Sequence, residues 1–277
     1  MANVDVALIQ TRTPATAAEG LAHLEPLVRQ AAADGATFIL TPEGSNLLEQ
    51  RRDRRDGVVT TEDADAAVLG LRALAAELGV WLLIGSAIVA SGHEGDARAA
   101  NRSLLIDAAG QVVGRYDKLH VFDVDLPNGE TYRESATIRP GDGAQVADTP
   151  FGRLGFAICY DVRFPHLFRQ LAKAGADMIA VPAAFTVQTG EAHWETLLRA
   201  RAIETGCFVL APAQGGLHAD GRRTWGRSII VGPWGEVIAR ADHDEPCVIT
   251  ATLDMDAVSR ARAAVPSLRH DRAFDPA

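Results

Sequence analysis

Three residues whose side chains can do covalent chemistry follow apolar, strand-like segments of this 277-residue sequence. Cys159 ends the apolar run 155–158, Glu43 follows residues 38–40 and a proline, and Lys118 lies between two strand-like segments. Ligands of open α/β sheets bind at the carboxyl ends of strands, so we expect these three side chains to face one site. A lone cysteine is usually a small buried hydrophobe and a lone charge a surface group, so only the three together carry this prediction.

A thiol that attacks a carbonyl or nitrile carbon forms a covalent acyl or thioimidate intermediate. Because a free thiol has a pKa of about 8.5, it needs a basic or cationic neighbour to react at neutral pH. Glu43 can take the thiol proton and later activate water. Lys118 can lower the thiol pKa and, with the backbone N–H after Cys159, hold the oxyanion. A helix that starts just after Cys159 would also favour the thiolate.

The composition argues against several other classes of protein. A formal net charge of −9 disfavours a nucleic-acid partner, which needs a basic face. The basic cluster at residues 51–56 alternates with acids and is expected to be a solvated loop or helix face. The longest apolar run, residues 80–90, is too short for a membrane span of about 20 residues. Three cysteines without a C-x-x-C pair, and an amino terminus without a basic flank, favour a cytoplasmic protein.

Common cofactor and metal motifs are missing from the sequence. The eight histidines show no H-E-x-x-H spacing, which disfavours a zinc hydrolase, so no metal is expected. There is no G-x-S-x-G, P-loop or G-x-G-x-x-G, which disfavours serine hydrolases, NTPases and dinucleotide-binding proteins. We therefore expect no cofactor.

Apolar periodicity and glycine or proline stops predict the regular elements. Helices are expected over residues 15–33, 62–78, 166–174 and 193–204, and Ile203 is expected to point inward from the last of them. Strands are expected over residues 4–10, 37–40, 81–88, 153–158, 178–181 and 208–210. Two hairpins are expected within residues 103–116 and 228–239.

The two halves of the chain resemble each other. Residues 33–42 and 174–182 both run from a helix end through a Gly-Ala turn and a strand to a proline. We therefore predict one domain over residues 1–277, built of two similar α/β halves whose sheets pack together, each with helices on one face. The polar carboxyl-terminal tail from about residue 265 is expected to cross a partner or to be disordered.

The segments around these residues resemble the Glu-Lys-Cys signatures of the carbon–nitrogen hydrolase (nitrilase) superfamily. Thr41-Pro42-Glu43, Asp117-Lys118-Leu119-His120 and Cys159-Tyr160-Asp161 occur in the family's order and separation, and the similarity runs from Val4 to about Phe274. The resemblance implies a four-layer αββα sandwich with two pseudo-symmetric halves. It also implies a homodimer whose helices pack across the interface.

The resemblance also assigns roles in catalysis. It implies Glu43 as general base, Lys118 as the group that stabilises the tetrahedral intermediate, and Cys159 as nucleophile. The family's second glutamate falls on Glu134, which would hold Lys118 and assist proton movement. Glu130 is the lesser candidate for that position.

The residues after the nucleophile, Tyr160-Asp161-Val162-Arg163, resemble the small-amidase branch with omega-amidase and deaminated glutathione amidase. Those enzymes cleave the ω-amide of a 2-oxo acid, so a small anionic amide is the expected substrate. The branch implies that Arg163 binds the substrate carboxylate, although surface arginines often pair with a nearby acid. Tyr160, Phe185 and Thr189 are the other implied substrate-binding residues.

Residues 182–186, 198–205 and 213–218 look more like the deaminated glutathione enzyme than like omega-amidase. Arg222 and Arg223 can meet the second carboxylate of that larger substrate, or can be solvated loop residues. The alternatives are an omega-amidase acting on 2-oxoglutaramate or 2-oxosuccinamate, and a carbamoylase or nitrilase. From another class of protein, the chain can be a catalytically silent dimeric scaffold.

Overall fold

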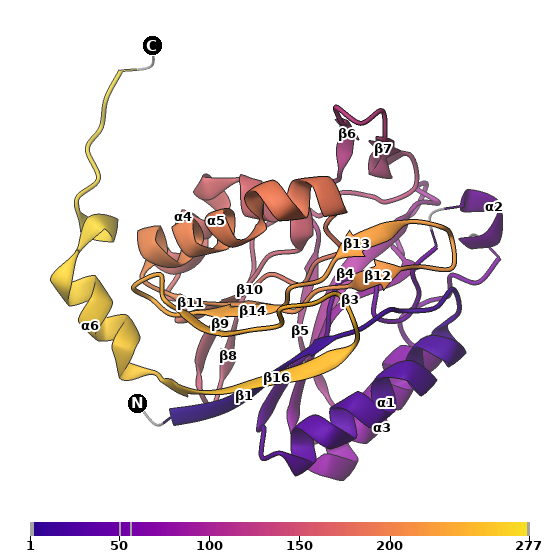
Figure 1. Ribbon diagram of the computed structural model, residues 1–277, viewed down its shortest axis with the longest axis horizontal. Helices are drawn as coiled ribbons and strands as arrows, with labels where there is room; N and C mark the ends of the chain where they lie inside the picture. Colours follow the sequence, from indigo (N-terminus) through magenta and orange to yellow (C-terminus); the bar gives the residue numbers. More distant parts are fainter. Residues whose placement is uncertain (1–2, 50, 56, 276–277) are drawn as a thin grey trace.

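The computed structural model describes residues 3–49, 51–55 and 57–275. Two six-stranded sheets pack face to face, and two helices cover the outer face of each sheet (Figure 1). The layers therefore run helices, sheet, sheet, helices, which confirms the predicted αββα sandwich. Within the described ranges, no helix combines the length and the apolar character that a membrane crossing requires.

The first sheet has three parallel strands at its centre, β1 to β3, with antiparallel neighbours on both sides. Helices α1 (Ala17–Ala33) and α3 (Ala66–Leu78) cover it, and Leu24 and Val68 pack from them against Ile39 of the sheet. From edge to edge the sheet contains β16 (Cys247–Asp254), β1 (Asn3–Gln10), β2 (Phe38–Leu40), β3 (Trp81–Ala90), β4 (Ala99–Ile106) and β5 (Val112–Asp117).

The second sheet repeats this plan. An antiparallel edge strand is followed by three parallel strands and two antiparallel ones, so the strand order shows the two similar halves that were predicted. Helices α4 (Pro165–Lys173) and α5 (Val187–Thr205) cover its outer face. From edge to edge it contains β15 (Val237–Arg240), β14 (Ile229–Val231), β11 (Phe208–Ala211), β10 (Met178–Ala180), β9 (Gly152–Phe156) and β8 (Val146–Thr149).

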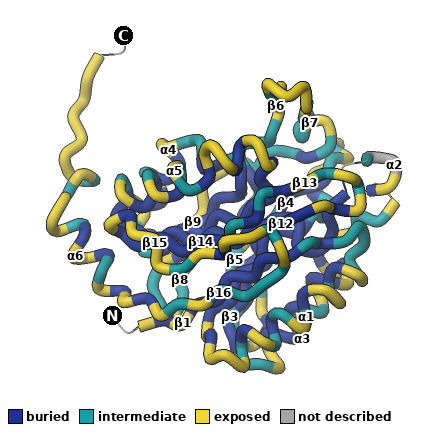
Figure 2. The backbone as a smooth tube through the Cα atoms, in the orientation of Figure 1, coloured by how far each residue is buried: buried dark blue, intermediate teal, exposed yellow. Residues whose placement is uncertain are grey.

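Apolar side chains from both sheets fill the space between them, and Figure 2 shows this inner region as the buried part of the molecule. Leu8 and Leu40 come from the first sheet and Ile179 from the second. The rings of Tyr116 and Phe156 stack across the sheets with centroids 6.2 Å apart. The two halves therefore share one core, which holds the ends of their strands in register.

Several short elements were not predicted from the sequence. They connect or extend the two sheets, and most lie near the strand ends that carry the reactive residues (Figure 1). They are the strands β6 (Asp123–Asp125), β7 (Thr131–Arg133), β12 (Gly215–Leu217) and β13 (Arg223–Trp225), the helices α2 (Arg52–Arg55) and α6 (Asp256–Ala264), and the 3-10 helices η1 (Glu134–Ala136), η2 (Cys159–Arg163) and η3 (Ser267–Arg269). The edge strands β8 and β16 of the two sheets were not predicted either.

Two helix starts and one side chain differ from the prediction. Helix α3 begins after its cap Asp65, not at residue 62, and α5 begins after its cap Thr186, not at residue 193. Both caps accept a backbone N–H, a local signal that the search for apolar periodicity missed. The inward position predicted for Ile203 is wrong, because 57% of this residue is exposed.

The carboxyl-terminal tail after α6 extends away from the body of the molecule (Figure 1). Residues 270–275 are exposed and form no regular element. Asp271 pairs with both Arg169 and Lys173 of α4, so this part of the tail is attached to its own chain.

Candidate active site

The three reactive residues follow strands that end at the same side of the two sheets. Glu43 comes after β2, Lys118 directly after β5, and Cys159 shortly after β9. They meet at a cavity of about 320 Å³, and all eight residues predicted for the site line it: Glu43, Lys118, Glu134, Cys159, Tyr160, Arg163, Phe185 and Thr189.

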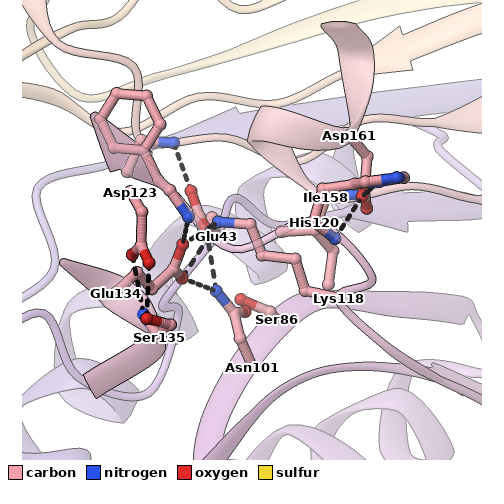
Figure 3. A network of polar contacts seen from close by, with 12 residues as sticks. Glu43, Ser86, Asn101, Lys118, His120, Asp123, Glu134, Ser135, Ile158 and Asp161 are labelled. Atoms are coloured by element: carbon pink, nitrogen blue, oxygen red, sulfur yellow. Dashed lines mark hydrogen bonds and ion pairs between the residues drawn. The ribbon is translucent and has the colours of Figure 1, made fainter. Parts of the chain in front are cut away.

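Lys118 lies at the centre of the polar network (Figure 3). Its Nζ is 3.0 Å from Glu43 Oε1 and 2.9 Å from Glu134 Oε2, and the residue is only 2% exposed. Burial by itself lowers the pKa of Lys118, but the charges of Glu134 and Glu43 outweigh it and raise the pKa well above its ordinary value. Lys118 is therefore a fixed cation.

Glu43 is held from several directions. Its Oε1 accepts hydrogen bonds from Lys118 and, at 2.9 Å, from Asn101 Nδ2, and its Oε2 accepts the Ala184 N–H at 2.9 Å. The Cys159 thiol is near enough to contribute to the lowered pKa of this carboxylate. Burial alone raises the pKa of Glu43, but Lys118 and these hydrogen bonds lower it below its ordinary value. Glu43 is therefore a carboxylate that lines the same cavity as the Cys159 thiol, as a general base for that thiol must.

Close packing of the backbone brings the Glu43 segment to this place. A Cβ on Gly85 of β3 would lie 1.7 Å from the carbonyl oxygen of Thr41, so only glycine lets the chain before Glu43 approach β3. From the other half of the molecule, Gln214 Nε2 donates to the carbonyl oxygen of Glu43 at 3.0 Å. Both halves thus position the same carboxylate.

Glu134 is the second carboxylate that holds Lys118. Its Oε2 also accepts the Phe122 N–H at 2.6 Å, and Asn101 Nδ2 is 3.4 Å from its Oε1 (Figure 3). Glu130 does not share this position, because it is exposed and bonds Tyr132 Oη at 3.0 Å.

Cys159 has an unusual backbone conformation. Its φ of +50° lies in the left-handed region, which few residues other than glycine adopt, and its N–H donates to the carbonyl oxygen of Pro182 at 2.9 Å. The residue starts the 3-10 helix η2, whose first N–H groups, including that of Tyr160, have no partner inside the helix. An oxyanion bound to Cys159 would meet this N–H and the ammonium of Lys118.

Lys118 lowers the pKa of the Cys159 thiol, as predicted, but the net shift of this pKa is upward. Burial and the nearby carboxylate of Glu43 raise the pKa of Cys159 well above its ordinary value, and the charge of Lys118 offsets only part of this. Lys118 also forms ion pairs with Glu43 and Glu134, so its charge is shared between the thiol and two carboxylates. The raised pKa of Cys159 and the lowered pKa of Glu43 therefore favour a neutral thiol with a carboxylate in the resting site.

Asp161 fixes the turn that carries the nucleophile, and the sequence analysis assigned it no role. Fully buried, it accepts four hydrogen bonds: from Tyr116 Oη at 2.7 Å, Ile158 N at 2.8 Å, His120 N at 3.0 Å and His120 Nδ1 at 2.6 Å. Asn101 was missed too. Asp161 and Asn101 are polar residues within apolar or turn-like sequence. Such a position indicates a buried side chain with hydrogen-bond partners, but it does not show which residues those partners are.

Replacing Asp161 with asparagine should loosen this turn. The asparagine amide has one acceptor oxygen, so it can accept only some of the four hydrogen bonds. Buried donors then lose their partner, and the free energy of unfolding should fall by about 2–4 kcal/mol. We expect kcat/KM to fall about 10- to 100-fold, because this turn carries both the sulfur of Cys159 and the substrate contacts Tyr160 and Arg163. Urea unfolding and steady-state kinetics measure both. Equal effects from Asp148→Asn, an exposed partner of Arg153, would contradict this role.

Arg163 and two aromatic rings form the wall next to Cys159. The guanidinium carbon of Arg163 lies 5.4 Å from the ring centroid of Phe185 and 5.9 Å from that of Tyr160. Its Nη1 is 3.3 Å from His193 Nδ1, and no carboxylate of the described residues forms an ion pair with it. The alternative of a surface arginine paired with an acid is therefore not observed.

The other predicted contacts differ in how much they offer a ligand. Thr189 lines the cavity, but its hydroxyl is 2.9 Å from that of Thr186 in the cap of α5. Arg222 lines the cavity too, whereas Arg223 is bound to Asp244 Oδ2 at 3.2 Å outside it.

The basic cluster at residues 51–56 is only partly solvated. Arg54 is exposed, but Arg55 is buried, lines the cavity and donates to Thr137 Oγ1 at 2.9 Å. The expectation of a fully solvated segment is thus wrong for Arg55, and Asp56 lies outside the described residues. In the described part of the chain, no three His, Cys, Asp or Glu side chains cluster so as to hold a metal ion.

Known proteins share this sequence and fold. The carbon-nitrogen hydrolase family model matches residues 5–263. The deaminated glutathione amidase of Yersinia enterocolitica is 41% identical over 273 residues, which cover 98% of this chain and 94% of that protein.

Solved structures agree. The C. elegans NitFhit protein has a TM-score of 0.87 at 33% identity, over 98% of this chain and 65% of that one. An amidase from Nesterenkonia sp. AN1 has a TM-score of 0.77 at 28% identity, over 95% of this chain and 98% of that one. One solved form of that amidase carries acrylamide added to its active-site cysteine. With its sequence matched over nearly its full length, this chain belongs to the carbon–nitrogen hydrolase family.

Proposed function

We propose that this chain is a cysteine amidase that hydrolyses deaminated glutathione through a thioester on Cys159. The observation that carries the proposal is one cavity in which a thiol, a carboxylate and an ammonium lie beside Arg163, a cation without an acidic partner. The name of the Yersinia relative supports the choice of substrate.

The first half of the reaction forms the thioester. Glu43 takes the proton of the thiol as sulfur attacks the amide carbon, and the carbonyl oxygen becomes an oxyanion. The Lys118 ammonium and the Tyr160 N–H stabilise that oxyanion. The C–N bond then breaks, and the protonated Glu43 returns its proton to the leaving amine. Arg163 holds the carboxylate of the 2-oxo acid during these steps.

The second half releases the acid. Glu43 is again a carboxylate and takes a proton from a water molecule, which attacks the thioester carbon. A second oxyanion forms in the same place and collapses with cleavage of the C–S bond. The thiolate recovers its proton from Glu43, and the 2-oxo acid leaves. Glu134 holds Lys118 throughout, so the cation does not move away as charge develops.

Comparing kcat/KM for deaminated glutathione and 2-oxoglutaramate tests the substrate. We expect the larger amide to be preferred, because part of the cavity wall lies beyond the groups that bind the 2-oxo acid. A tenfold preference for the shorter amide, about 1.4 kcal/mol of transition-state binding, would point to an omega-amidase instead. Turnover of simple nitriles or release of carbon dioxide would point to a nitrilase or carbamoylase.

The ionic states of Glu43 and Cys159 predict an unusual pH dependence. The lowered pKa of Glu43 and the raised pKa of Cys159 keep the carboxylate and the neutral thiol together over a wide pH range. We expect kcat/KM to be level from about pH 5 to about pH 8.5 and to fall only below the ordinary glutamate pKa of about 4.3. A pH–rate profile checks this. A rate that rises with a midpoint near neutral pH would indicate a thiolate mechanism instead.

We also infer that two copies of the chain assemble through an apolar surface on α5 and the β14–β15 turn. Ile203 is 57% exposed and Trp234 is 61% exposed. A Cβ on Gly235 would lie 2.6 Å from Ile203, so the two side chains belong to neighbouring segments. Contiguous apolar surface of this kind marks interfaces. Light scattering should give twice the monomer mass, and Ile203→Glu should reduce it to the monomer value.

A reducing cytoplasm suits this chemistry, and we propose it as the compartment. Cys159, Cys207 and Cys247 are all free, and oxidation of Cys159 would stop the reaction. Recovery of the protein in the membrane or secreted fraction of fractionated cells would contradict this location.

A further inference from the structure

The proposed substrate carries a carboxylate on each side of the amide that is cleaved. One belongs to the 2-oxo acid, and the other ends the cysteinylglycine tail. A carboxylate that loses its water in a cavity needs a cation, and a bidentate guanidinium suits it. Arg163 lies next to Cys159 and can hold the first carboxylate. The second carboxylate needs another cation in the cavity wall.

Among the described residues, four arginines line the catalytic cavity: Arg55, Arg133, Arg163 and Arg222. Arg133 is engaged with Asp125 Oδ1 at 2.7 Å and with two backbone carbonyl oxygens. Arg55 is buried and donates to Thr137. With Arg163 beside the nucleophile, Arg222 is the arginine best suited to the second carboxylate.

Arg222 is at a boundary between two cavities. It lies on the turn between β12 and β13 and borders both the catalytic cavity and a second cavity of about 800 Å³. The two cavities share Arg222, Thr131 and Tyr132. The backbone of Arg222 is fixed, because its N–H donates to Asp220 Oδ1 at 3.0 Å and its carbonyl oxygen accepts the His218 N–H at 2.8 Å. A substrate tail that extends toward the second cavity therefore passes this side chain.

The guanidinium of Arg222 is available to a ligand. Its Nε is buried without a hydrogen-bond partner, and no carboxylate of the described residues forms an ion pair with it. Buried polar groups nearly always have a partner in folded proteins, so this donor suits a bound anion. Its neighbour Arg223 differs, since it is bound to Asp244 and 64% of its side chain is exposed. Burial and the charge of Arg222 lower the pKa of His218 to about 4, so this histidine is neutral at pH 7.

We infer that Arg222 binds the terminal carboxylate of the substrate tail and so selects the longer amide. This inference rests on the proposed function, because the shorter ω-amides have no second carboxylate. It assigns the two ends of the substrate to two arginines, with Arg163 at the end that forms the thioester.

The test compares deaminated glutathione with an analogue in which the terminal glycine is a carboxamide. Both contain the same scissile amide, so the ratio of their kcat/KM values reports the carboxylate alone and does not depend on the fraction of folded enzyme. The wild-type ratio should be about tenfold or more in favour of the acid. Arg222→Met should reduce the ratio to about one, and Arg222→Lys should retain part of it. Arg223→Met is the matched control and should keep the wild-type ratio.

Three results would overturn the inference. A ratio that survives in Arg222→Met, or that is lost only in Arg55→Met, would place the tail carboxylate elsewhere. Equal kcat/KM for the acid and the carboxamide in the wild type would also overturn it, while leaving the amidase function intact. If the wild type cleaves neither compound, the proposed function fails and the inference fails with it.

Discussion

A Glu43→Gln variant should lose about 10³- to 10⁴-fold in kcat and should accumulate an acyl group on Cys159. Without the carboxylate, the charge of Glu43 no longer raises the pKa of the thiol, while Lys118 still lowers it, so the thiol can still give its proton to solvent. Water is a far weaker acid, so hydrolysis of the thioester should slow more than its formation. Intact-mass measurement after mixing with deaminated glutathione should therefore show the chain plus one 2-oxo acyl group.

Two double variants show where the acyl group is attached. The added mass should be absent from Glu43→Gln/Cys159→Ala and should persist in Glu43→Gln/Cys247→Ala, whose second change is on half-buried β16 outside the cavity. An adduct that survives the loss of Cys159 would exclude this thiol as nucleophile. Normal turnover by Glu43→Gln would exclude Glu43 as base.

A Lys118→Met variant should lose both activity and stability. The ammonium is the cation for two carboxylates at 3.0 and 2.9 Å, and removing it leaves Glu43 buried without a counter-charge. Breaking a buried ion pair in this way costs about 3–5 kcal/mol of unfolding free energy. Loss of an oxyanion donor should lower kcat by a further factor of about 10²–10³. Denaturant unfolding and steady-state kinetics measure the two effects separately.

The loss of stability in Lys118→Met should depend on pH, and it should be larger at neutral pH than in acid. In the folded wild type the pKa of Glu43 is lowered. Its ionised form therefore stabilises the fold at pH values above about 4.3, the pKa of glutamate in the unfolded chain. This stabilisation is lost as the pH falls through the pKa of Glu43 in the folded chain. The deficit of Lys118→Met should thus be largest at neutral pH and should shrink below about pH 4. Adding Glu134→Gln should recover part of the stability but none of the activity.

The matched control is Lys173→Met. Lys173 is a surface lysine of α4 paired with Asp271, and exposed pairs contribute about 0–1 kcal/mol. If Lys173→Met loses as much stability as Lys118→Met, the buried ion pairs of Lys118 are not the cause of the stability loss in Lys118→Met. Full stability of Lys118→Met at neutral pH would mean that Glu43 is protonated in the resting enzyme.

Most of the fold could be predicted because its signals are local. The strand at residues 38–40 and the proline after it mark where Glu43 leaves the first sheet, and the apolar run before Cys159 does the same in the second. The repeated Gly-Ala turn and strand in the two halves already indicated the symmetry that the strand orders show. The starts of α3 and α5 were missed because capping by Asp65 and Thr186 is a separate signal from apolar periodicity.

Several residues of the site had no signal that identified their role. Asn101 lies within β4, and Arg55 follows other charged residues in a segment that looks solvated. Whether such a side chain faces a cavity depends on what packs against it from other parts of the chain. Ile203 is the opposite case. It is an apolar residue at a helix position predicted to be buried, but it is exposed because no other element of the described chain covers it.

Taken alone, the amino-acid sequence determined the four layers, the two similar halves and the strand ends that carry Glu43, Lys118 and Cys159, because apolar periodicity and turn residues act over a few neighbouring positions. Only the tertiary structure decided the ionic state of the thiol. It also decided which arginines of the cavity have no acidic partner. Both depend on burial and on distances of a few ångström between remote segments, such as the 2.9 Å hydrogen bond between Glu43 and the Ala184 N–H, 141 residues apart.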